Sequence, residues 1–298
     1  MSWRVARAVR QEGWSGEVLA IHPRSCYVTG EDADIYAVVQ QPVGNGPLSL
    51  VIPASDDALA GLTEGTSVSS TGSHLMVGDG LVVGLEQARL WDPKAYPALG
   101  ANPEALSRCL TEVYRTATTR SPEQSLARLL PHIHEEELPE ALTAIAHFPR
   151  SHALIVGLID ALGRRNRRSL KVVTSSLAGL GPGMTPAGDD FLAGILLSLA
   201  LAQEHRPDTD LAEIAGLLAE TAVPRTNEIS AAYLRVAYAG ETSERWHGLL
   251  KALSTGEAGD AAGAAETVMQ FGETSGADML AGFLVGMETV SPGPGLTA

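Results

Sequence analysis

The chain has 298 residues, of which 45% are hydrophobic and 19% charged, a composition typical of a folded globular protein with about two domains. Its formal charge of −14 opposes binding to nucleic-acid phosphates, and with 5% aromatic residues no aromatic stacking surface for single strands is evident. The longest largely apolar run, Phe191 to Ala202, has 12 residues and is too short to span a bilayer. Because no signal-peptide pattern follows the start, we expect a cytoplasmic protein without a membrane contact.

The first hundred residues consist of short runs rich in β-branched residues, separated by Gly, Pro, Asn and Asp. Short strands with such turn residues are typical of a small barrel or sandwich, so the sequence predicts a β-rich, barrel-like domain over residues 1–98. The glycine-bearing segments Gly44–Gly46 and Gly78–Gly80 suit tight hairpin turns, which require positive φ angles.

After a proline-rich linker at Trp91–Pro103, a 3.6-residue periodicity predicts an all-helical domain over residues 99–298. The fold class expected for the whole chain is therefore α+β. Leu170–Leu177 is ambiguous because β-branched residues lie between helical flanks. The expected helices are Ser107–Thr119, Pro122–Leu130, Glu136–Phe148, His152–Leu162, Asp190–Gln203, Asp210–Thr221, Glu228–Ala239, Ala258–Phe271 and Ala277–Glu288.

An internal repeat lies in the helical half. GDDFLAGILLSL (188–199) and GADMLAGFLVGM (276–287) align without a gap at an offset of 88 residues and share the pattern G-x-D-x-L-A-G. Glycine inside a helix costs about 0.5–1 kcal/mol relative to alanine, so matched glycines at 194 and 282 predict a close helix crossing. The crossing brings Asp190 and Asp278 within roughly two helical turns of each other.

The aspartates of the repeat are expected to have different roles. Asp189 is predicted to cap its helix, because an acidic side chain near a helix N-terminus is favourable. Asp190 and Asp278 are candidate catalytic residues and candidate metal ligands. A purely structural role, with the Ala-Gly pairs serving packing alone, stays equally open for Asp190.

The stretch GLGPGMTPAG, residues 179–188, lies directly before Asp189 and is called the glycine loop. It lacks the lysine of a phosphate-binding P-loop and the third glycine of a dinucleotide fingerprint, so no nucleotide cofactor is expected. Gly181 and Gly183 free backbone N–H groups, Thr185 adds a hydroxyl, and the helix that begins near Gly188 adds its own amides, which together favour an anionic substrate. A cation such as Mg²⁺, or a substrate rich in hydrogen-bond donors, is then needed beside the aspartates. The alternative is a rigid connection between two helices.

Two further segments supply candidate substrate-binding residues. Thr226 and Ser230 are either helix-capping hydroxyls or ligand contacts, and Arg225 is either a surface residue or a clamp for a carboxylate. The residues that open the second repeat, Thr274, Ser275 and Gly276, are likewise caps or ligand contacts. The basic cluster RRNRR (164–168) is interpreted as solvated surface or as a docking patch for an acidic partner.

Three motifs carry a family resemblance: GLGPGMTPAGDDFLAG (179–194), TNEISAAYL (226–234) and TSGADMLAG (274–282). In this order they resemble the AllH family, whose named members are one subunit of oxamate carbamoyltransferase. The β-rich first part followed by helices is similar to that family along most of the chain. The family pattern often has Leu and Ser where this chain has Met184 and Ala187, so a hydroxyl is missing beside the loop.

The resemblance implies a subunit of an oligomeric enzyme that converts oxalurate and phosphate into oxamate and carbamoyl phosphate during allantoin use. It implies partner subunits similar to acyl-CoA synthetases, a small anionic substrate, and Mg²⁺. The alternative function is a non-catalytic assembly or ligand-sensing subunit of a purine- or allantoin-degrading or related acyl-transfer complex, in which the same motifs only pack helices.

Overall fold

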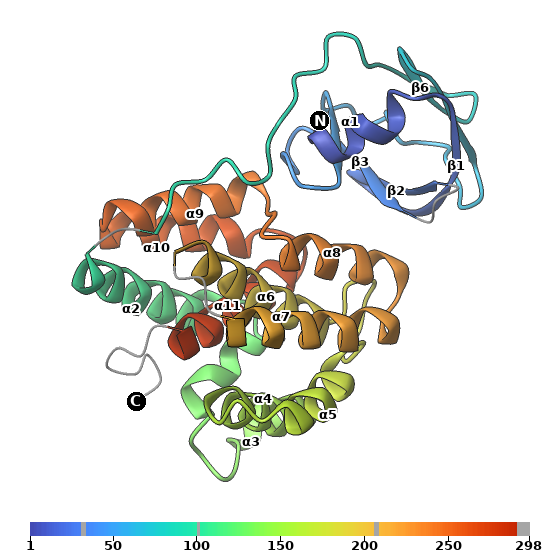
Figure 1. The fold of residues 1–298 in the computed structure, drawn as a ribbon. Helices are drawn as coiled ribbons and strands as arrows, with labels where there is room; N and C mark the ends of the chain where they lie inside the picture. Colours follow the sequence, from blue (N-terminus) through green and yellow to red (C-terminus); the bar gives the residue numbers. More distant parts are fainter. Residues whose placement is uncertain (31–33, 100–101, 206–208, 291–298) are drawn as a thin grey trace. The chain divides into compact units, whose positions relative to one another are not determined.

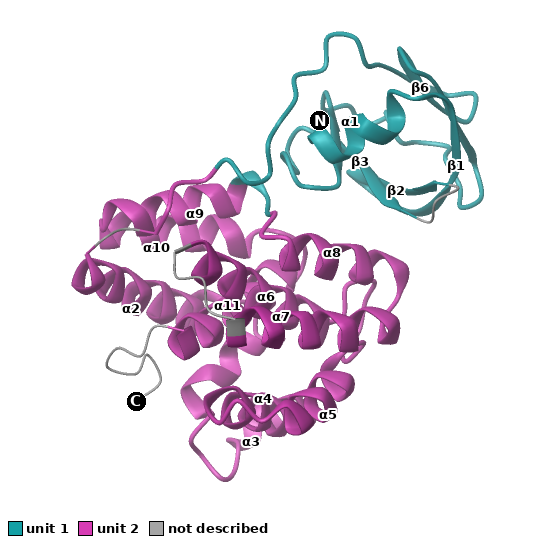
Figure 2. Cartoon of the chain, in the orientation of Figure 1, with its two compact units in different colours: residues 1–95, 242–244 teal, residues 96–241, 245–298 magenta. Residues whose placement is uncertain are grey.

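A computed structural model describes residues 1–30, 34–99, 102–205 and 209–290. The chain forms two compact units, drawn in different colours in Figure 2. The β-rich unit comprises residues 1–95 and 242–244, and the helical unit comprises residues 96–241 and 245–298.

The β-rich unit holds one seven-stranded sheet in the order β4-β3-β2-β1-β5-β6-β7. All neighbouring strands are antiparallel except β3 and β4, which are parallel. The sheet curls into a near-barrel (Figure 1), which confirms the predicted fold class. Its elements are α1 (Trp3–Val9), β1 (Glu12–His22), β2 (Ser25–Gly30), β3 (Ile35–Gln40), β4 (Ser49–Ile52), β5 (Ser67–Thr71), β6 (His74–Val77) and β7 (Leu81–Gly84).

A buried apolar core lies within this unit. Every residue of β3 is buried, and α1 contributes Val5 and Val9 to the same cluster as Val28 and Val38. The apolar side of α1 thus packs into the same core as the strands, and burial of these side chains stabilises the unit. Helix α1 was not predicted from the sequence, because its seven residues are too few to show a helical period.

The two expected hairpin turns have different outcomes. Gly78–Gly80 connects β6 to the antiparallel β7, and Gly78 has a φ of 56°, so a hairpin turn is confirmed there. Gly44–Gly46 lies between β3 and β4, which pair in parallel, so the hairpin prediction is wrong for this segment. Gly44 still needs its φ of 88°, because a left-handed conformation serves a crossover as well as a hairpin.

The helical unit confirms most of the predicted helices. The predicted helix Glu136–Phe148 is helical only at Glu140–Thr143 and at Phe148, where the next helix begins, and the predicted helix Pro122–Leu130 is a 3₁₀ helix that starts later, at Leu126. The ambiguous segment 170–177 is helical, and one helix, Glu244–Thr255, was missed. The elements are α2 (Pro103–Arg120), η1 (Leu126–His132), α3 (Glu140–Thr143), α4 (Phe148–Gly163), α5 (Arg167–Leu177), α6 (Ala187–His205), α7 (Thr209–Ala222), η2 (Val223–Arg225), α8 (Glu228–Tyr238), α9 (Glu244–Thr255), α10 (Ala258–Met269) and α11 (Ser275–Val290).

The centre of the helical unit is the pair α6 and α11, with the other helices around it (Figure 1). Both helices are apolar around most of their circumference, as expected for helices that are buried on all sides. The large side chains of Phe191 and Phe283 are fully buried there. None of the helices among the described residues combines the length and the hydropathy needed to cross a membrane.

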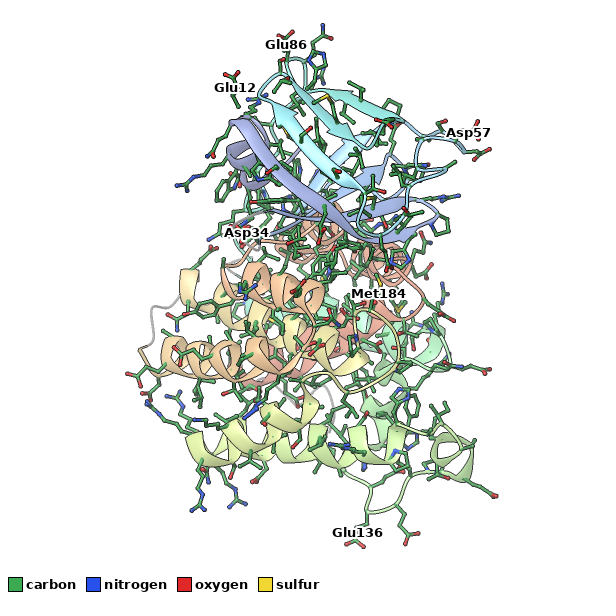
Figure 3. All side chains as sticks on the ribbon, turned by 90° about the vertical axis from the view of Figure 1, so that its right-hand side faces the viewer. Glu12, Asp34, Asp57, Glu86, Glu136 and Met184 are labelled. Carbon is green, nitrogen blue, oxygen red and sulfur yellow. The ribbon has the colours of Figure 1, made fainter. Side chains whose placement is uncertain are left out.

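Most of the acidic side chains, which give the chain its negative charge, lie at its surface. Glu12, Asp57, Glu86 and Glu136 are exposed, and their side chains project outward in Figure 3. Asp189 and Asp278 are exceptions, because each is buried within the helical unit. Carboxylates are almost never fully buried without a partner, so Asp189 and Asp278 mark a candidate functional site.

Candidate functional site

The site begins with the crossing of α6 and α11, where two glycines replace side chains. A Cβ atom on Gly194 would lie 1.9 Å from the Met279 carbonyl oxygen, and one on Gly282 would lie 1.8 Å from the Phe191 carbonyl oxygen. Real Cβ atoms do not approach that closely, so the two backbones touch only because both residues lack a side chain. The predicted crossing at these glycines is confirmed.

The contacts at the crossing are reciprocal. Phe191 and Met279 occupy equivalent positions in the two repeats, so each glycine contacts the residue equivalent to the other's partner. Gly188 and Gly276 are also closely packed, but each against the end of the helix that precedes its own repeat: a Cβ there would lie 2.1 Å from the Leu177 oxygen of α5 and 2.0 Å from the Val268 oxygen of α10. The repeat therefore folds into two similar halves that face each other across α6 and α11.

Asp190 and Asp278 are the carboxylates that these halves contribute. Burial, followed by the nearby charge of Asp278, raises the pKa of Asp190 well above its usual range. Burial raises the pKa of Asp278 to about 6, although hydrogen bonds from Thr274, Leu126 and Ser125 oppose the shift. The two carboxyl groups are thus close enough to interact, as the crossing predicts.

Asp278 has a clear structural task. Its Oδ1 accepts a hydrogen bond of 2.8 Å from the Ser125 hydroxyl and one of 2.6 Å from the Leu126 backbone N–H. These donors stand at the start of η1, where backbone N–H groups have no partner within the helix. Asp278 therefore holds the N-terminus of η1 through one oxygen, while its other oxygen, Oδ2, is buried without a hydrogen-bond partner among the described residues.

Asp190 is surrounded by hydroxyl groups. The hydroxyls of Thr185 and Ser275 lie 2.8 Å apart, and hydrogen bonds from Ser275 and Thr185 partly offset the rise in the pKa of Asp190. Asp190 as a whole keeps some exposed surface, but its Oδ2 atom is buried and has no hydrogen-bond partner in the described part of the chain. The crossing thus contains two carboxylate oxygens whose hydrogen-bonding capacity is unused.

The glycine loop leads directly into this region. Gly179, Gly181 and Gly183 have φ angles of 73°, 117° and 91°, which other residues rarely adopt. Five backbone N–H groups of the glycine loop have no acceptor among the described residues, those of Gly181, Gly183, Met184, Thr185 and Ala187. Met184 is labelled in Figure 3 and marks the loop. Unpaired amides at the start of a 19-residue helix form a favourable environment for an anion.

Asp189 does not have the predicted role. Its carboxylate accepts from the Gly179 N–H at 2.9 Å and from the Thr226 hydroxyl, not from the first-turn amides of α6. Burial raises the pKa of Asp189, and the bonds from Thr226, Gly179 and Ser230 oppose that rise. The helix-cap prediction is wrong because the loop folds back over the helix start, so Asp189 connects the first residue of the loop and the distant Thr226 to the first turn of α6.

The segment 226–230 holds the loop at its other end. The Asn227 side-chain amide donates to the Met184 carbonyl at 2.8 Å, and the Ser230 hydroxyl donates to the same oxygen at 3.4 Å. Thr226 donates to Asp189 at the base of the loop. The sequence analysis missed Asn227, although an Asn before a helix is a common cap, and its Oδ1 does accept from the Ser230 N–H.

The remaining predicted residues lie around the same crossing. Arg225 is exposed, and its backbone carbonyl lies beside Gly179. Thr274 and Ser275 open α11, and Gly188 and Gly276 permit the close helix contacts described above. The basic cluster is largely neutralised, because Arg164, Arg165 and Arg167 pair with acidic side chains.

Neither the cysteines nor a cluster of metal-binding side chains among the described residues contributes to this site. Cys26 and Cys109 are free thiols with 0% exposure, and burial raises the pKa of Cys26 to about 11. In the residues that the structure describes, no three His, Cys, Asp or Glu side chains are grouped to hold a metal ion. Asp190 and Asp278 alone would supply two oxygen ligands, so any cation here needs further ligands from hydroxyl groups, solvent or substrate.

Comparison with known families follows the same division of the chain. A model described as the AllH family N-terminal domain matches residues 1–90, and a model described as oxamate carbamoyltransferase subunit AllH matches residues 177–287. The second match contains the glycine loop, α6, segment 226–230 and the start of α11. No solved structure matches the chain.

Proposed function

Because the chain belongs to the AllH family, we propose that it is a subunit of a complex that transfers a carbamoyl group between oxalurate and phosphate. The family description names an oxamate carbamoyltransferase subunit, which indicates an assembly of several chains. In the proposed reaction a phosphate oxygen attacks the carbamoyl carbon and the bond from that carbon to the oxamate nitrogen breaks. The proton lost by hydrogen phosphate is taken up by that nitrogen, which balances the step.

The single observation that carries the proposed site is the set of unpaired N–H groups in the glycine loop. Both substrates are anions, one a phosphate and the other a carboxylate, and both accept hydrogen bonds from backbone amides at a helix N-terminus. Gly181 and Gly183 leave these amides unobstructed, because neither carries a side chain. The loop thus supplies donors without using the charge of an arginine or lysine.

The carboxylate of Asp190 supports the same substrate assignment, because its negative charge suits the donor groups of the substrate as the loop amides suit its anionic groups. A carbamoyl group carries N–H donors, and a carboxylate accepts such donors more strongly than a neutral oxygen does. Thr185 and Ser275 place two hydroxyls beside Asp190, and these can orient a carbonyl or a phosphate oxygen. We assign the loop to the anionic end of the substrate and Asp190 to its nitrogen end, with Arg225 and Thr226 as further candidate contacts.

A second candidate function is a non-catalytic assembly or ligand-sensing subunit. The observation that favours it is the internal use of the acidic groups, because Asp189 and Asp278 both hold neighbouring segments of this chain. In that case the motifs serve helix packing, and the partner subunits similar to acyl-CoA synthetases carry the chemistry.

Reconstitution separates the two functions. The chain is combined with its partner subunits, oxalurate, phosphate and Mg²⁺, and formation of carbamoyl phosphate is measured for the wild type and for Asp190→Asn. The matched control is Asp260→Asn, an exposed aspartate in the first turn of α10. We expect the wild type and the control to be active, and Asp190→Asn to lose at least about a hundredfold in rate, a common loss when a catalytic group is removed.

Full activity of Asp190→Asn in the assembled complex contradicts a catalytic role for this carboxylate. Calorimetry with phosphate and with oxamate on the purified chain tests the second function. An assembly subunit binds neither anion, while its Gly194→Leu variant fails to join the complex.

A further inference from the structure

The segment that joins α10 to the first turn of α11, residues 270–277, is called the second loop, because it precedes its repeat as the glycine loop precedes the other. Five of its backbone N–H groups have no acceptor among the described residues, those of Gly272, Glu273, Thr274, Ser275 and Ala277. Three of them are equivalent, at the offset of 88 residues, to unpaired N–H groups of the glycine loop. The equivalent pairs are Met184 with Gly272, Thr185 with Glu273, and Ala187 with Ser275. Each half of the repeat therefore presents backbone donors at the start of a long helix.

A buried acceptor at the second loop has an oxygen without a donor. Asp278 lies in the first turn of α11 and is 0% exposed. The Thr274 side chain donates toward its carboxylate and opposes the rise in its pKa, so this carboxylate lies against the second loop. Ser125 and Leu126 occupy Oδ1, whereas Oδ2 has no hydrogen-bond partner among the described residues. A buried carboxylate oxygen without a donor is costly, so Oδ2 points to a ligand that carries one.

From these amides and this oxygen, we propose that the second loop is a second anion subsite, which takes a small carboxylate. The N–H groups of the loop donate to the carboxylate of the ligand, as backbone amides do at other helix N-termini. Oδ2 of Asp278 accepts from an N–H group next to that carboxylate. The oxamate end of oxalurate carries both groups, and this identification of the ligand rests on the proposed function.

The charges of the two loops decide which anion each one takes. The glycine loop has no charged side chain in residues 179–188, whereas the second loop carries the exposed Glu273. A phosphate has more negative charge than a carboxylate at neutral pH, so Glu273 repels a phosphate more strongly. Phosphate therefore binds at the glycine loop, and the carboxylate binds at the second loop.

The two subsites adjoin each other. The Thr185 hydroxyl, from the glycine loop, lies 2.8 Å from the Ser275 hydroxyl, from the second loop. Anions on either side of this contact share one site, in which the amide donors offset their mutual repulsion. Both substrates of the proposed reaction thus bind to one chain, and no second subunit is needed to hold either of them.

Calorimetry on the purified full chain, with Mg²⁺ present and without partner subunits, tests the second subsite. Oxamate is titrated into the wild type with and without saturating phosphate, and acetate is used as a carboxylate that lacks an amide. We expect one oxamate per chain in both conditions, because phosphate occupies the other loop. Competition between oxamate and phosphate for one site overturns the proposal, and so does the absence of binding by both oxamate and acetate.

Two glycine variants show where each anion binds. Gly272 has a φ of 65°, and a Cβ there would lie 3.2 Å from the Ser275 Cβ, so Gly272→Ala distorts the second loop. We expect it to weaken oxamate binding at least about tenfold without changing phosphate binding, whereas Gly183→Ala shows the reverse pattern. The matched control Gly61→Ala, with a φ of 81° and open space around a Cβ, should change neither affinity. Wild-type oxamate affinity in Gly272→Ala, or equal losses for both anions in either loop variant, overturns the proposal.

Glu273→Gln is a variant that keeps the backbone of the loop, because this side chain is exposed. Loss of its charge should tighten oxamate binding about two- to fivefold, while Glu86→Gln, at an exposed glutamate of the β-rich unit, leaves it unchanged. Unchanged affinity in Glu273→Gln contradicts a carboxylate at this loop, and circular dichroism checks the fold of each variant. If Gly272→Ala abolishes acetate binding but oxamate binds no more tightly than acetate, the subsite stands and the proposed substrate fails. None of these measurements depends on carbamoyl transfer.

Discussion

Substitution of Gly194 by alanine tests the helix crossing on which the site depends. The new Cβ would lie 1.9 Å from the Met279 oxygen, 2.5 Å from the Phe283 nitrogen and 3.0 Å from the Gly282 carbonyl carbon. All three are backbone atoms, so no side chain can rotate away and α11 must retreat by at least about 1 Å. Overpacking of a dense core destabilises by about 1–3 kcal/mol, and here the shift also loosens contacts along both helices.

We expect Gly194→Ala to lower the unfolding free energy by about 3 kcal/mol, after an offset of up to about 1 kcal/mol from the better helix propensity of alanine. For a unit of this size, the melting temperature should fall by about 6–12 °C. Gly248→Ala is the matched control, because Gly248 is exposed in the middle of α9 and a Cβ there meets no atom within 4 Å. It should raise stability by about 0.5–1 kcal/mol.

Differential scanning calorimetry of the two variants and the wild type gives the comparison. The reasoning fails if Gly194→Ala is as stable as Gly248→Ala, because the helix backbones then do not meet at this glycine. A large loss in both variants would instead show that α9 is packed more tightly than its exposure indicates.

Two further predictions concern the buried carboxyl groups. Asp189→Ala leaves the Gly179 N–H and the Thr226 hydroxyl unpaired, so urea unfolding should show a loss of about 2–3 kcal/mol, and a loss below about 0.5 kcal/mol would contradict the connecting role. The folded-state pKa of Asp278, about 6, lies above the ordinary value of 3.8, so the folded chain binds this proton more tightly than the unfolded chain. In the metal-free chain its contribution to stability is therefore full below about pH 4 and is lost as the pH rises through 6, by up to ~3 kcal/mol. Urea titrations at pH 4 to 7 should show this fall for the wild type but not for Asp278→Asn, and parallel pH profiles would refute it.

The sequence was most informative where a pattern repeats. The β-rich and helical halves followed from strand and helix periodicity, and the crossing followed from glycines at matched places in two copies of G-x-D-x-L-A-G. A glycine within an apolar helix has few physical reasons to be there, so two at the same position indicate contact. The predictions of the two halves and of the helix crossing therefore depended on local patterns and on the alignment of the two internal repeats.

The rest depended on contacts between distant segments, which no local pattern contains. Ser125 meets Asp278 across 153 residues, and the acidic pattern around Asp189 is the same whether it caps its own helix or connects to Thr226. The α9 helix was missed because its periodicity is interrupted by Gly248 and polar residues. Tertiary packing, not propensity, decides these cases.

Phosphate binding by the purified chain tests the central claim most directly. Calorimetry is performed with Mg²⁺ present on the wild type, on Gly183→Ala and on the matched control Gly65→Ala. Both glycines have positive φ angles, 91° and 79°, and open space around a Cβ, so both substitutions strain the backbone by a similar amount, but only Gly183 lies in the glycine loop. We predict one phosphate per chain for the wild type and Gly65→Ala, and binding at least about tenfold weaker for Gly183→Ala. Equal affinity in all three proteins, or no phosphate binding by the wild type, would contradict an anion site at this loop.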